Sequence, residues 1–196
     1  MQADTPREIY NILLLGDQYS GKTRFFNELC EIQGESKKTS TKNDHKYLIT
    51  TNIDLCAFNY NIHGRNLRIQ LWDTPSSSAY QQIISRFMIK PFYMIIIMFT
   101  NDTFLRIHNW LEFINDQQLS YTPIIMLMEN NTELLKNSHK KSPDTIIEKY
   151  PYLKYSINIY GQSFYILKTI IEESMIDKTN TVRICCKDRK GNRCCF

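Results

Sequence analysis

The sequence predicts an α/β domain with a mainly parallel sheet between two layers of helices, and three observations lead to this fold class. Short apolar runs recur along the chain, and stretches with helical spacing of apolar residues separate most of them. A polar turn sequence at residues 61–66 joins the second and third runs directly, which favours one antiparallel hairpin. A chain of 196 residues with 42% apolar content suits one such domain. We therefore expect a three-layer domain with a six-stranded sheet.

The strands are predicted from the apolar runs, taken in chain order. The fourth run, FYMIIIMF, is typical of a strand buried on both faces, and its eight residues fall far short of the ~20 that span a bilayer. The expected strands are residues 9–15, 53–62, 67–72, 93–99, 124–128 and 152–156.

The helices are predicted from apolar residues that recur every three or four positions. In the last of them Phe164, Leu167 and Ile171 share one face. Two polar stretches without such periodicity, residues 33–46 and 130–142, are expected to be loops. The expected helices are residues 23–31, 80–88, 104–118 and 163–176. Because the pattern ends after Asp177, we expect a folded domain over residues 1–177 and a disordered tail over residues 178–196.

Charge and cysteine are concentrated in this tail. The net charge of the whole chain is +4, whereas residues 178–196 alone carry six basic residues and one acid, so the body is close to neutral. That distribution argues against a nucleic-acid-binding body and favours a tail that approaches an anionic membrane. Four of the six cysteines lie among the last twelve residues. The start of the chain lacks the apolar stretch of a secretory signal, so a disulfide framework is not expected.

One motif carries specific chemistry. Residues 16–23, GDQYSGKT, fit the pattern G-x-x-x-x-G-K-[ST] directly after an expected strand and before an expected helix. In such a loop Gly16 and Gly21 let the backbone N–H groups face a phosphate, Lys22 neutralises phosphate charge, and the Thr23 hydroxyl ligates Mg²⁺. The alternative is an ordinary glycine turn that caps a helix. Kinases and ATPases use the same loop, so the motif alone does not identify the nucleotide.

Residues 67–74, LRIQLWDT, resemble the strand of Rab proteins, a branch of the Ras superfamily of small GTPases, that leads into Asp-Thr-Ala-Gly-Gln-Glu. The resemblance runs from about residue 9 to residue 176. It implies a P-loop GTPase fold that binds GTP or GDP with Mg²⁺. Thr23 and Thr50 would then ligate Mg²⁺, and Asp73 would hold it through water. The implied nucleotide contacts are Gly16, Asp17, Gln18, Tyr19, Ser20, Gly21, Lys22, Thr23, Arg24, Thr50, Ser76, Asn130, Asn131, Glu133, Ser156, Ile157 and Asn158.

The chain departs from the Rab pattern after Asp73-Thr74, where the family's Ala-Gly-Gln-Glu becomes Pro-Ser-Ser-Ser. Ser76 replaces a glycine whose N–H senses the γ-phosphate. Ser77 replaces the glutamine that positions the attacking water, and Gln18 replaces a residue that is most often glycine. The resemblance thus implies slow GTP hydrolysis, with Ser77 and Gln18 as the residues at the catalytic positions.

Base recognition departs as well. The family's Asn-Lys-x-Asp falls on residues 130–133, NNTE, so Asn131 replaces the lysine and Glu133 replaces the aspartate. Glu133 is either the acceptor for guanine or an exposed acid beside a helix start. The family's Ser-Ala-Lys segment resembles residues 156–158, where the contact is a backbone N–H at Ile157.

The C-terminus ends Arg193-Cys194-Cys195-Phe196, which is not a C-a-a-X box. It resembles the paired cysteines on which Rab proteins receive two geranylgeranyl groups, so Cys194 and Cys195 are expected lipidation sites, with palmitoylation of Cys185 and Cys186 as a further expectation. Zinc binding by the cysteine pairs is the alternative, although no C-x-x-C spacing is present. The implied location is the cytoplasmic face of intracellular membranes, with a cytosolic carrier-bound pool.

By this resemblance the chain is a monomeric switch in vesicle trafficking, and its implied partners are effectors, exchange factors, prenyl-transfer machinery and a lipid carrier, but no nucleic acid. Two alternatives stay open. The first is a pseudo-GTPase that keeps the fold and holds nucleotide weakly or not at all. The second is a P-loop kinase or ATPase, which the strand at residues 67–74 and the lack of an arginine-rich lid segment disfavour.

Overall fold

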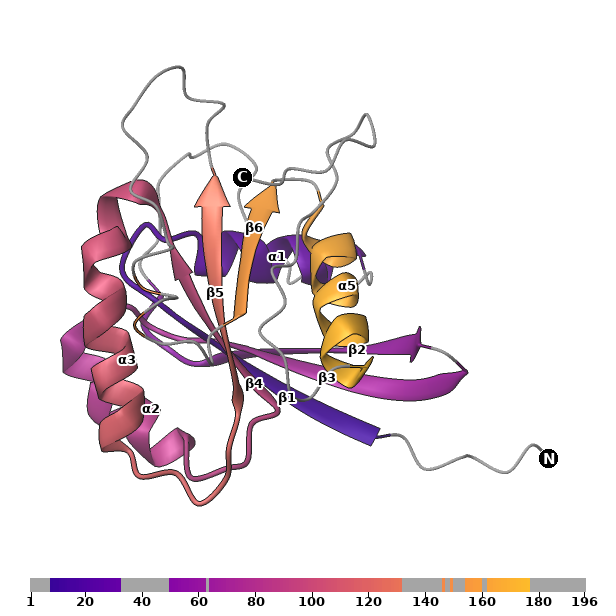
Figure 1. Cartoon of the computed structure of the whole chain (residues 1–196), viewed down its shortest axis with the longest axis horizontal. Coiled ribbons are helices and arrows are strands. Elements are labelled where there is room, and N and C mark those ends of the chain that lie inside the picture. The colour runs from indigo at the N-terminus through magenta and orange to yellow at the C-terminus, as the bar shows by residue number, and fades with distance from the viewer. Residues whose placement is uncertain are drawn as a thin grey trace.

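The computed structural model describes residues 8–32, 50–62, 64–131, 146, 149, 154–159 and 162–176, with residues 131 and 154–159 described by their backbone. Strands and helices alternate along the chain as the sequence predicts (Figure 1). The elements are β1 (Glu8–Leu15), α1 (Lys22–Ile32), β2 (Asp54–Ile62), β3 (Arg65–Asp73), the 3₁₀ helix η1 (Ser78–Tyr80), α2 (Gln81–Phe87), β4 (Met94–Phe99), the 3₁₀ helix η2 (Asn101–Arg106), α3 (Ile107–Asp116), β5 (Ile124–Asn131), β6 (Lys154–Ile159) and α5 (Ser163–Ile176).

The six strands form one sheet in the order β2-β3-β1-β4-β5-β6. Every neighbouring pair is parallel except β2 and β3, which pair antiparallel from Asp54↔Asp73 to Ile62↔Arg65. The predicted hairpin is therefore confirmed. The strand β1 lies in the interior of the sheet, and its last four residues, 12–15, are fully buried. Burial on both faces is the reason that this segment reads as a continuous apolar run.

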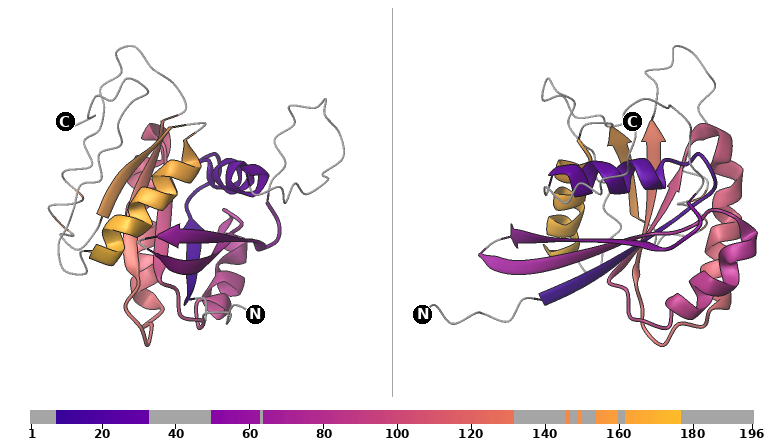
Figure 2. Two further views of the ribbon diagram at one scale, coloured as in Figure 1. Left: turned by 90° about the vertical axis from the view of Figure 1, so that its right-hand side faces the viewer. Right: turned by 180° about the vertical axis from the view of Figure 1, so that it is seen from behind.

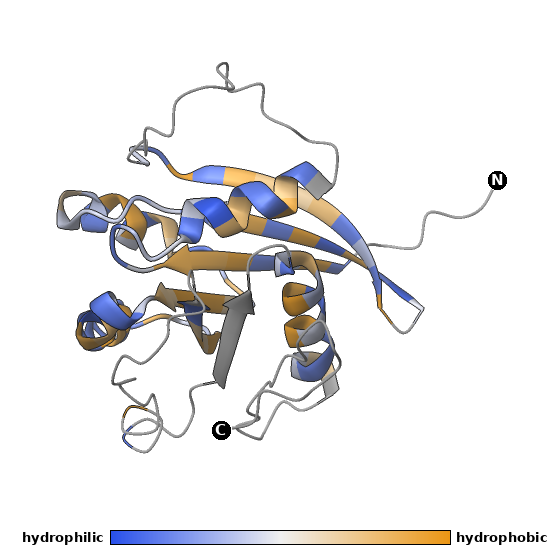
Figure 3. Ribbon diagram, turned by 90° about the horizontal axis from the view of Figure 1, so that it is seen from above, coloured by the Kyte–Doolittle hydropathy of each residue, from blue (hydrophilic) through white to orange (hydrophobic). Residues whose placement is uncertain are grey.

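Helices cover both faces of the sheet, with α1 and α5 on one side and α2 and α3 on the other (Figures 1 and 2). Two separate apolar clusters fill the space between the layers. Leu14 packs with Phe25 and Ile170 in one cluster, and Leu13 packs with Trp110 in the other. Figure 3 shows mixed polar and apolar bands along the helices around mostly apolar central strands. The three-layer prediction is confirmed. Within the described part of the chain, no helix combines the length and the apolar character needed to cross a bilayer.

Several predicted boundaries of strands and helices are wrong. The strand β5 continues to Asn131, so residues 130 and 131 extend the strand instead of beginning a loop. The strand β6 runs to Ile159 and pairs with β5 through Asn131↔Ile159, so all of residues 156–158 lie inside a strand. Mutual backbone pairing extends both strands beyond their apolar runs. The expected helices at 80–88 and 104–118 each begin as a 3₁₀ turn, η1 and η2.

Other predictions lie outside the described residues. These are the loop at residues 33–46, the second polar stretch from residue 132 to 142 and the tail at residues 178–196. The helix α5 ends at Ile176, one residue before the predicted domain boundary.

Candidate nucleotide-binding site

The carboxyl ends of five strands meet at one edge of the sheet, because β3, β1, β4, β5 and β6 are mutually parallel. The chain leaves β1 at this edge between two neighbours, β3 and β4, that lie on opposite sides of it. Crevices at such points are where ligands bind in open α/β sheets. The predicted site residues on β1, β3, β5 and β6 all lie at or just after this edge.

The loop between β1 and α1 has a backbone that only glycine permits at two positions. Gly16 has φ of 139° and Gly21 has φ of 93°. A Cβ on Gly16 would collide with the carbonyl oxygen of Met98, and a Cβ on Gly21 would collide with the side-chain amide of Asn130. Between them Tyr19 adopts φ of 65°, with its side chain exposed. Alternation of this kind turns successive N–H groups toward one concavity, which is an anion-binding arrangement.

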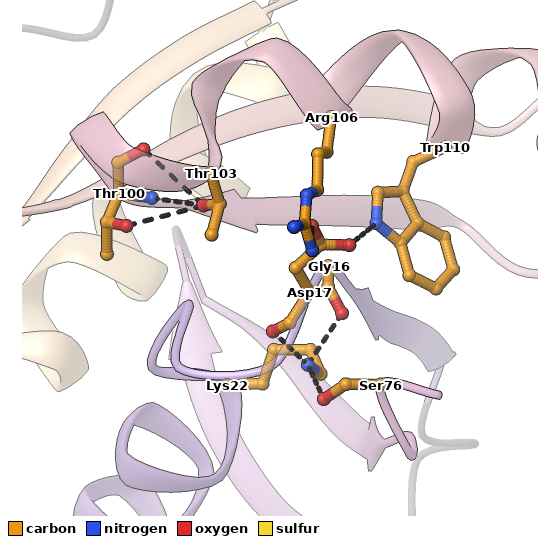
Figure 4. Close-up of polar contacts among 8 residues, drawn as sticks. All are labelled: Gly16, Asp17, Lys22, Ser76, Thr100, Thr103, Arg106 and Trp110. Carbon is orange, nitrogen blue, oxygen red and sulfur yellow. Dashed lines mark hydrogen bonds and ion pairs between the residues drawn. The ribbon is translucent and has the colours of Figure 1, made fainter. Parts of the chain in front are cut away.

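Lys22, the first residue of α1, points its ammonium group back into this loop (Figure 4). Its Nζ donates to the carbonyl oxygens of Gly16 (2.8 Å) and Asp17 (3.1 Å) and to the hydroxyl of Ser76 (2.8 Å). The residue is 3% exposed. Burial lowers the pKa of Lys22 to about 8, and the nearby charges of Asp73 and Asp17 partly oppose that shift. The lysine is still mainly cationic at neutral pH, so the site holds a buried positive charge that suits an anion.

Three oxygen-bearing side chains gather beside this lysine. The Thr23 hydroxyl donates to Asp73 Oδ2 at 2.7 Å and lies 2.7 Å from the Thr50 hydroxyl. Asp73 is fully buried, and its burial raises the pKa of the carboxyl to about 6, although the Thr23 hydrogen bond opposes the shift. Of the predicted metal residues, Thr23 thus contacts both Thr50 and Asp73.

This cluster fits a magnesium ion. Asp73 Oδ1 is buried and has no hydrogen-bond partner among the described residues. An unpartnered buried carboxylate oxygen is costly, and a hard cation bound by oxygen ligands would remove that cost. The hydroxyl of Ser20, inside the loop, is likewise buried and unpartnered among the described residues. Both polar atoms are explained by a ligand that carries phosphate and a cation.

The loop is also tied to α3, which the sequence did not reveal. The Asp17 carboxylate accepts from Trp110 Nε1 at 2.9 Å and from Arg106 Nη1 at 3.2 Å (Figure 4). At the start of η2, the Thr100 N–H donates to the Thr103 hydroxyl at 2.9 Å. The sequence offered one signal for the contact between Trp110 and Asp17, because a buried indole N–H needs a hydrogen-bond acceptor. It indicated that Trp110 had an acceptor but not which one.

The segment after β3 is anchored to the same loop. The Thr74 hydroxyl donates to the Leu14 carbonyl at 2.6 Å, and Ser76 reaches Lys22 as described. Ser77 is exposed, and its hydroxyl accepts from the Ala79 N–H at the start of η1. Gln18 is half-buried at the tip of the loop. Ser77 and Gln18, the residues at the predicted catalytic positions, therefore lie on two segments that meet at Lys22.

The base side of the site is described only in part. Asn130 is 5% exposed and lies against Gly21. The strand register pairs Met128 with Ser156 and Asn130 with Asn158, so the two predicted base-binding segments are neighbours in the sheet. Arg24 is exposed on α1. Glu133, Cys194 and Cys195 lie outside the described residues.

Comparison with known proteins agrees with this geometry. The family model "Ras of Complex, Roc, domain of DAPkinase" matches residues 11–133. A Ras and EF-hand domain-containing protein homolog of Caenorhabditis elegans is 26% identical over 128 residues, which cover 64% of this chain. The chain spans about a fifth of the length of that relative, because the same alignment covers 19% of it.

Two Rab proteins align over more of their own length. Ras-related protein Rab-27B of Bos taurus is 24% identical over 164 residues, which cover 76% of this chain and 71% of the relative. Ras-related protein Rab-19 of Homo sapiens is 26% identical over 146 residues, covering 72% and 63%. Since the Roc match extends over more than half of the chain, the chain belongs to the Ras superfamily of small GTPases, as a Roc-type domain with Rab-like relatives.

Proposed function

We propose that the chain is a Rab-like, membrane-attached GTP-binding switch in vesicle trafficking, with slow intrinsic hydrolysis. The observation that carries the proposal is the convergence of Lys22, Thr23, Thr50 and Asp73 at the mouth of one glycine-bounded loop. The buried ammonium group of Lys22 lies near a carboxylate oxygen of Asp73 that has no partner among the described residues, and this pair matches a phosphate chain with its cation. The effectors, exchange factors, prenyl-transfer machinery and lipid carrier of such a switch, and its monomeric state, are part of the proposal.

Each residue has a defined role toward the bound nucleotide. Lys22 and the loop N–H groups would bind the phosphate oxygens. Thr23 and Thr50 would ligate Mg²⁺ directly, and Asp73 would hold it through water. The ion would neutralise phosphate charge. Because Thr50 and Ser76 come from separate segments, a γ-phosphate that fixes the positions of both relative to the loop would change the surface offered to an effector.

Hydrolysis should be slow because Ser77, the residue at the catalytic position, is poorly suited to hold the attacking water. The Ser77 hydroxyl is exposed and bonded to the Ala79 N–H, and it is shorter than a glutamine amide. We expect a single-turnover rate at or below the ~10⁻⁴ s⁻¹ scale of unaided Ras-type enzymes. Ser77→Gln should raise it. A wild-type rate far above this scale contradicts the proposal, and a fall in rate on Gln18→Gly identifies Gln18 as a replacement for the missing amide.

Membrane attachment would come from geranylgeranyl groups on Cys194 and Cys195, because two lipid chains give stable anchoring where one gives only marginal binding. The basic tail would add attraction to an anionic leaflet. The intact mass of the protein from its native cell tests this step. Detection of an unmodified C-terminal peptide contradicts the proposed lipid attachment. Loss of lipid mass on Cys194→Ser together with Cys195→Ser, but not on Cys185→Ser, supports it.

The central experiment is extraction of the nucleotide from purified protein and its chromatographic identification. Guanine nucleotide supports the switch. The second candidate function is a pseudo-GTPase binding module, which the Asn131 and Ser77 substitutions favour. Absence of nucleotide supports that candidate, and adenine nucleotide supports a kinase or ATPase instead.

A further inference from the structure

The hydrogen bond between Ser76 and Lys22 joins the segment after β3 to the start of α1. A phosphate bound to Lys22 would lie between these two segments. We propose that the Ser76 hydroxyl is an internal stand-in for a phosphate oxygen, which stabilises the empty site and thereby weakens nucleotide binding and speeds nucleotide release. The inference rests on the proposed nucleotide-binding function and adds a regulatory device to it.

Lys22 has as many acceptors as it has N–H donors. An ammonium group has three N–H donors, and each has one acceptor here. Two acceptors, the carbonyls of Gly16 and Asp17, belong to the loop itself and fix its shape. The third, Ser76, comes from the segment after β3. A phosphate that takes a donor without unfolding the loop must therefore displace Ser76.

Ser76 is held in position for this contact by its neighbours in the chain. Two residues earlier Thr74 is fully buried and bonded to the Leu14 carbonyl at 2.6 Å, in the strand that leads into the loop. Pro75, also buried, has a fixed φ. On the other side Ser77 caps η1. Because the segment is pinned on both sides, little conformational entropy is lost when the Ser76 hydroxyl meets Lys22.

Loss of the Ser76 acceptor would leave a buried donor of Lys22 without a partner. Lys22 is 3% exposed, so water has little access to a donor that loses its acceptor. A buried charged donor without a partner is among the costly defects of a folded protein. The Ser76 hydroxyl prevents this defect in the nucleotide-free protein, whereas a glycine, which the Rab resemblance leads one to expect here, has no side-chain oxygen to accept the bond.

The test compares Ser76→Ala with wild type in the full chain, using GDP with Mg²⁺ as the probe. We expect GDP to bind about tenfold more tightly to Ser76→Ala and to dissociate correspondingly more slowly, as loss of one competing hydrogen bond predicts. The melting temperature of the nucleotide-free protein should fall by about 3 °C. The two changes go in opposite directions, whereas a purely structural role would lower the melting temperature without tightening GDP.

Two control variants sharpen the comparison. Ser78→Ala makes the same chemical change two residues away, at an exposed position, and should alter neither quantity. Ser76→Thr keeps the hydroxyl and should resemble wild type. Equal GDP affinity and release in wild type and Ser76→Ala overturn the inference while the proposed function stands. If neither wild type nor Ser76→Ala binds GDP, the proposed function and the inference are both overturned. If Ser76→Ala binds GDP and wild type does not, the inference is supported.

Discussion

The phosphate half of the site, residues 16–23 with Asp73 and Ser76, differs in construction from the base half, residues 130–133 and 156–158. The phosphate half is built from a loop backbone, one buried lysine and short side chains, with hydrogen-bond distances of 2.7 to 3.1 Å among them. The base half was predicted from particular side chains, and two of these, Asn131 and Glu133, differ from the Rab pattern. From this difference we expect phosphate binding and guanine selectivity to be separable in this chain.

The halves are nevertheless in contact at one point. Asn130, at the end of β5, lies so close to Gly21 that a Cβ there would overlap its side-chain amide. The close approach ties the base half to the phosphate loop through packing. It is independent of whether Asn131 and Glu133 recognise the base.

The largest effect is expected from Lys22→Ala. The variant loses an ammonium group that donates both to the loop and to the segment after β3, and charge-assisted bonds are worth about 1.5–3 kcal/mol each. Nucleotide retention through gel filtration should fall at least ~100-fold. Lys168→Ala, which removes an exposed lysine of α5, should have no effect. Retention by Lys22→Ala would mean that the base half carries the affinity.

A second large effect is expected where the halves meet. Gly21→Ala should destabilise the protein by about 3 kcal/mol, because a strained positive φ and a collision with Asn130 act together. Gly64 provides the matched control. It has φ of 78° and open space around a Cβ, so Gly64→Ala should cost only the backbone strain of about 1–2 kcal/mol. Urea denaturation measures both, and equal losses would contradict close packing at Asn130.

A smaller effect is expected from the base half alone. Glu133→Ala should reduce the preference for GTP over ATP by roughly tenfold, the value of one charged hydrogen bond, while total phosphate affinity is kept. Competition binding with the two nucleotides measures the ratio, and Glu172→Ala on α5 is the control. An unchanged ratio would assign discrimination elsewhere, with the Ile157 N–H as the next candidate.

The smallest effect concerns the helix behind the base half. The Tyr60 hydroxyl donates to the Phe164 carbonyl of α5, and burial raises the pKa of Tyr60. An unfolded tyrosine ionises near pH 10. Above that pH the unfolded chain loses a proton that the folded chain keeps, so stability falls as pH rises. When the pH is raised from 8 to 11, the free energy of unfolding should fall in both proteins. The fall should be about 1.4 kcal/mol smaller for Tyr60→Phe than for wild type. Identical losses would contradict the burial of this phenol.

The sequence alone determined the layers of the fold and the phosphate loop. Apolar runs such as residues 92–99 predicted strands buried on both faces, since burial is recorded in local composition. The spacing of Gly16, Gly21 and Lys22 predicted the loop because its shape depends on residues that are adjacent in the chain. The same reasoning placed Thr23 and Asp73 at a metal site by resemblance, and the structure brings them within 2.7 Å.

Tertiary structure decided the contacts between segments far apart in the chain. The extension of β5 to Asn131 follows from pairing with β6, which no local pattern records. The partners of Asp17, which are Trp110 and Arg106 on α3 and η2, are chosen by how that helix packs against the sheet. Ser76 meets Lys22 only because Thr74 is anchored to β1. Residue identity fixes what each group can bind, but packing of the layers fixes which groups meet, since distance in space is set by the whole sheet.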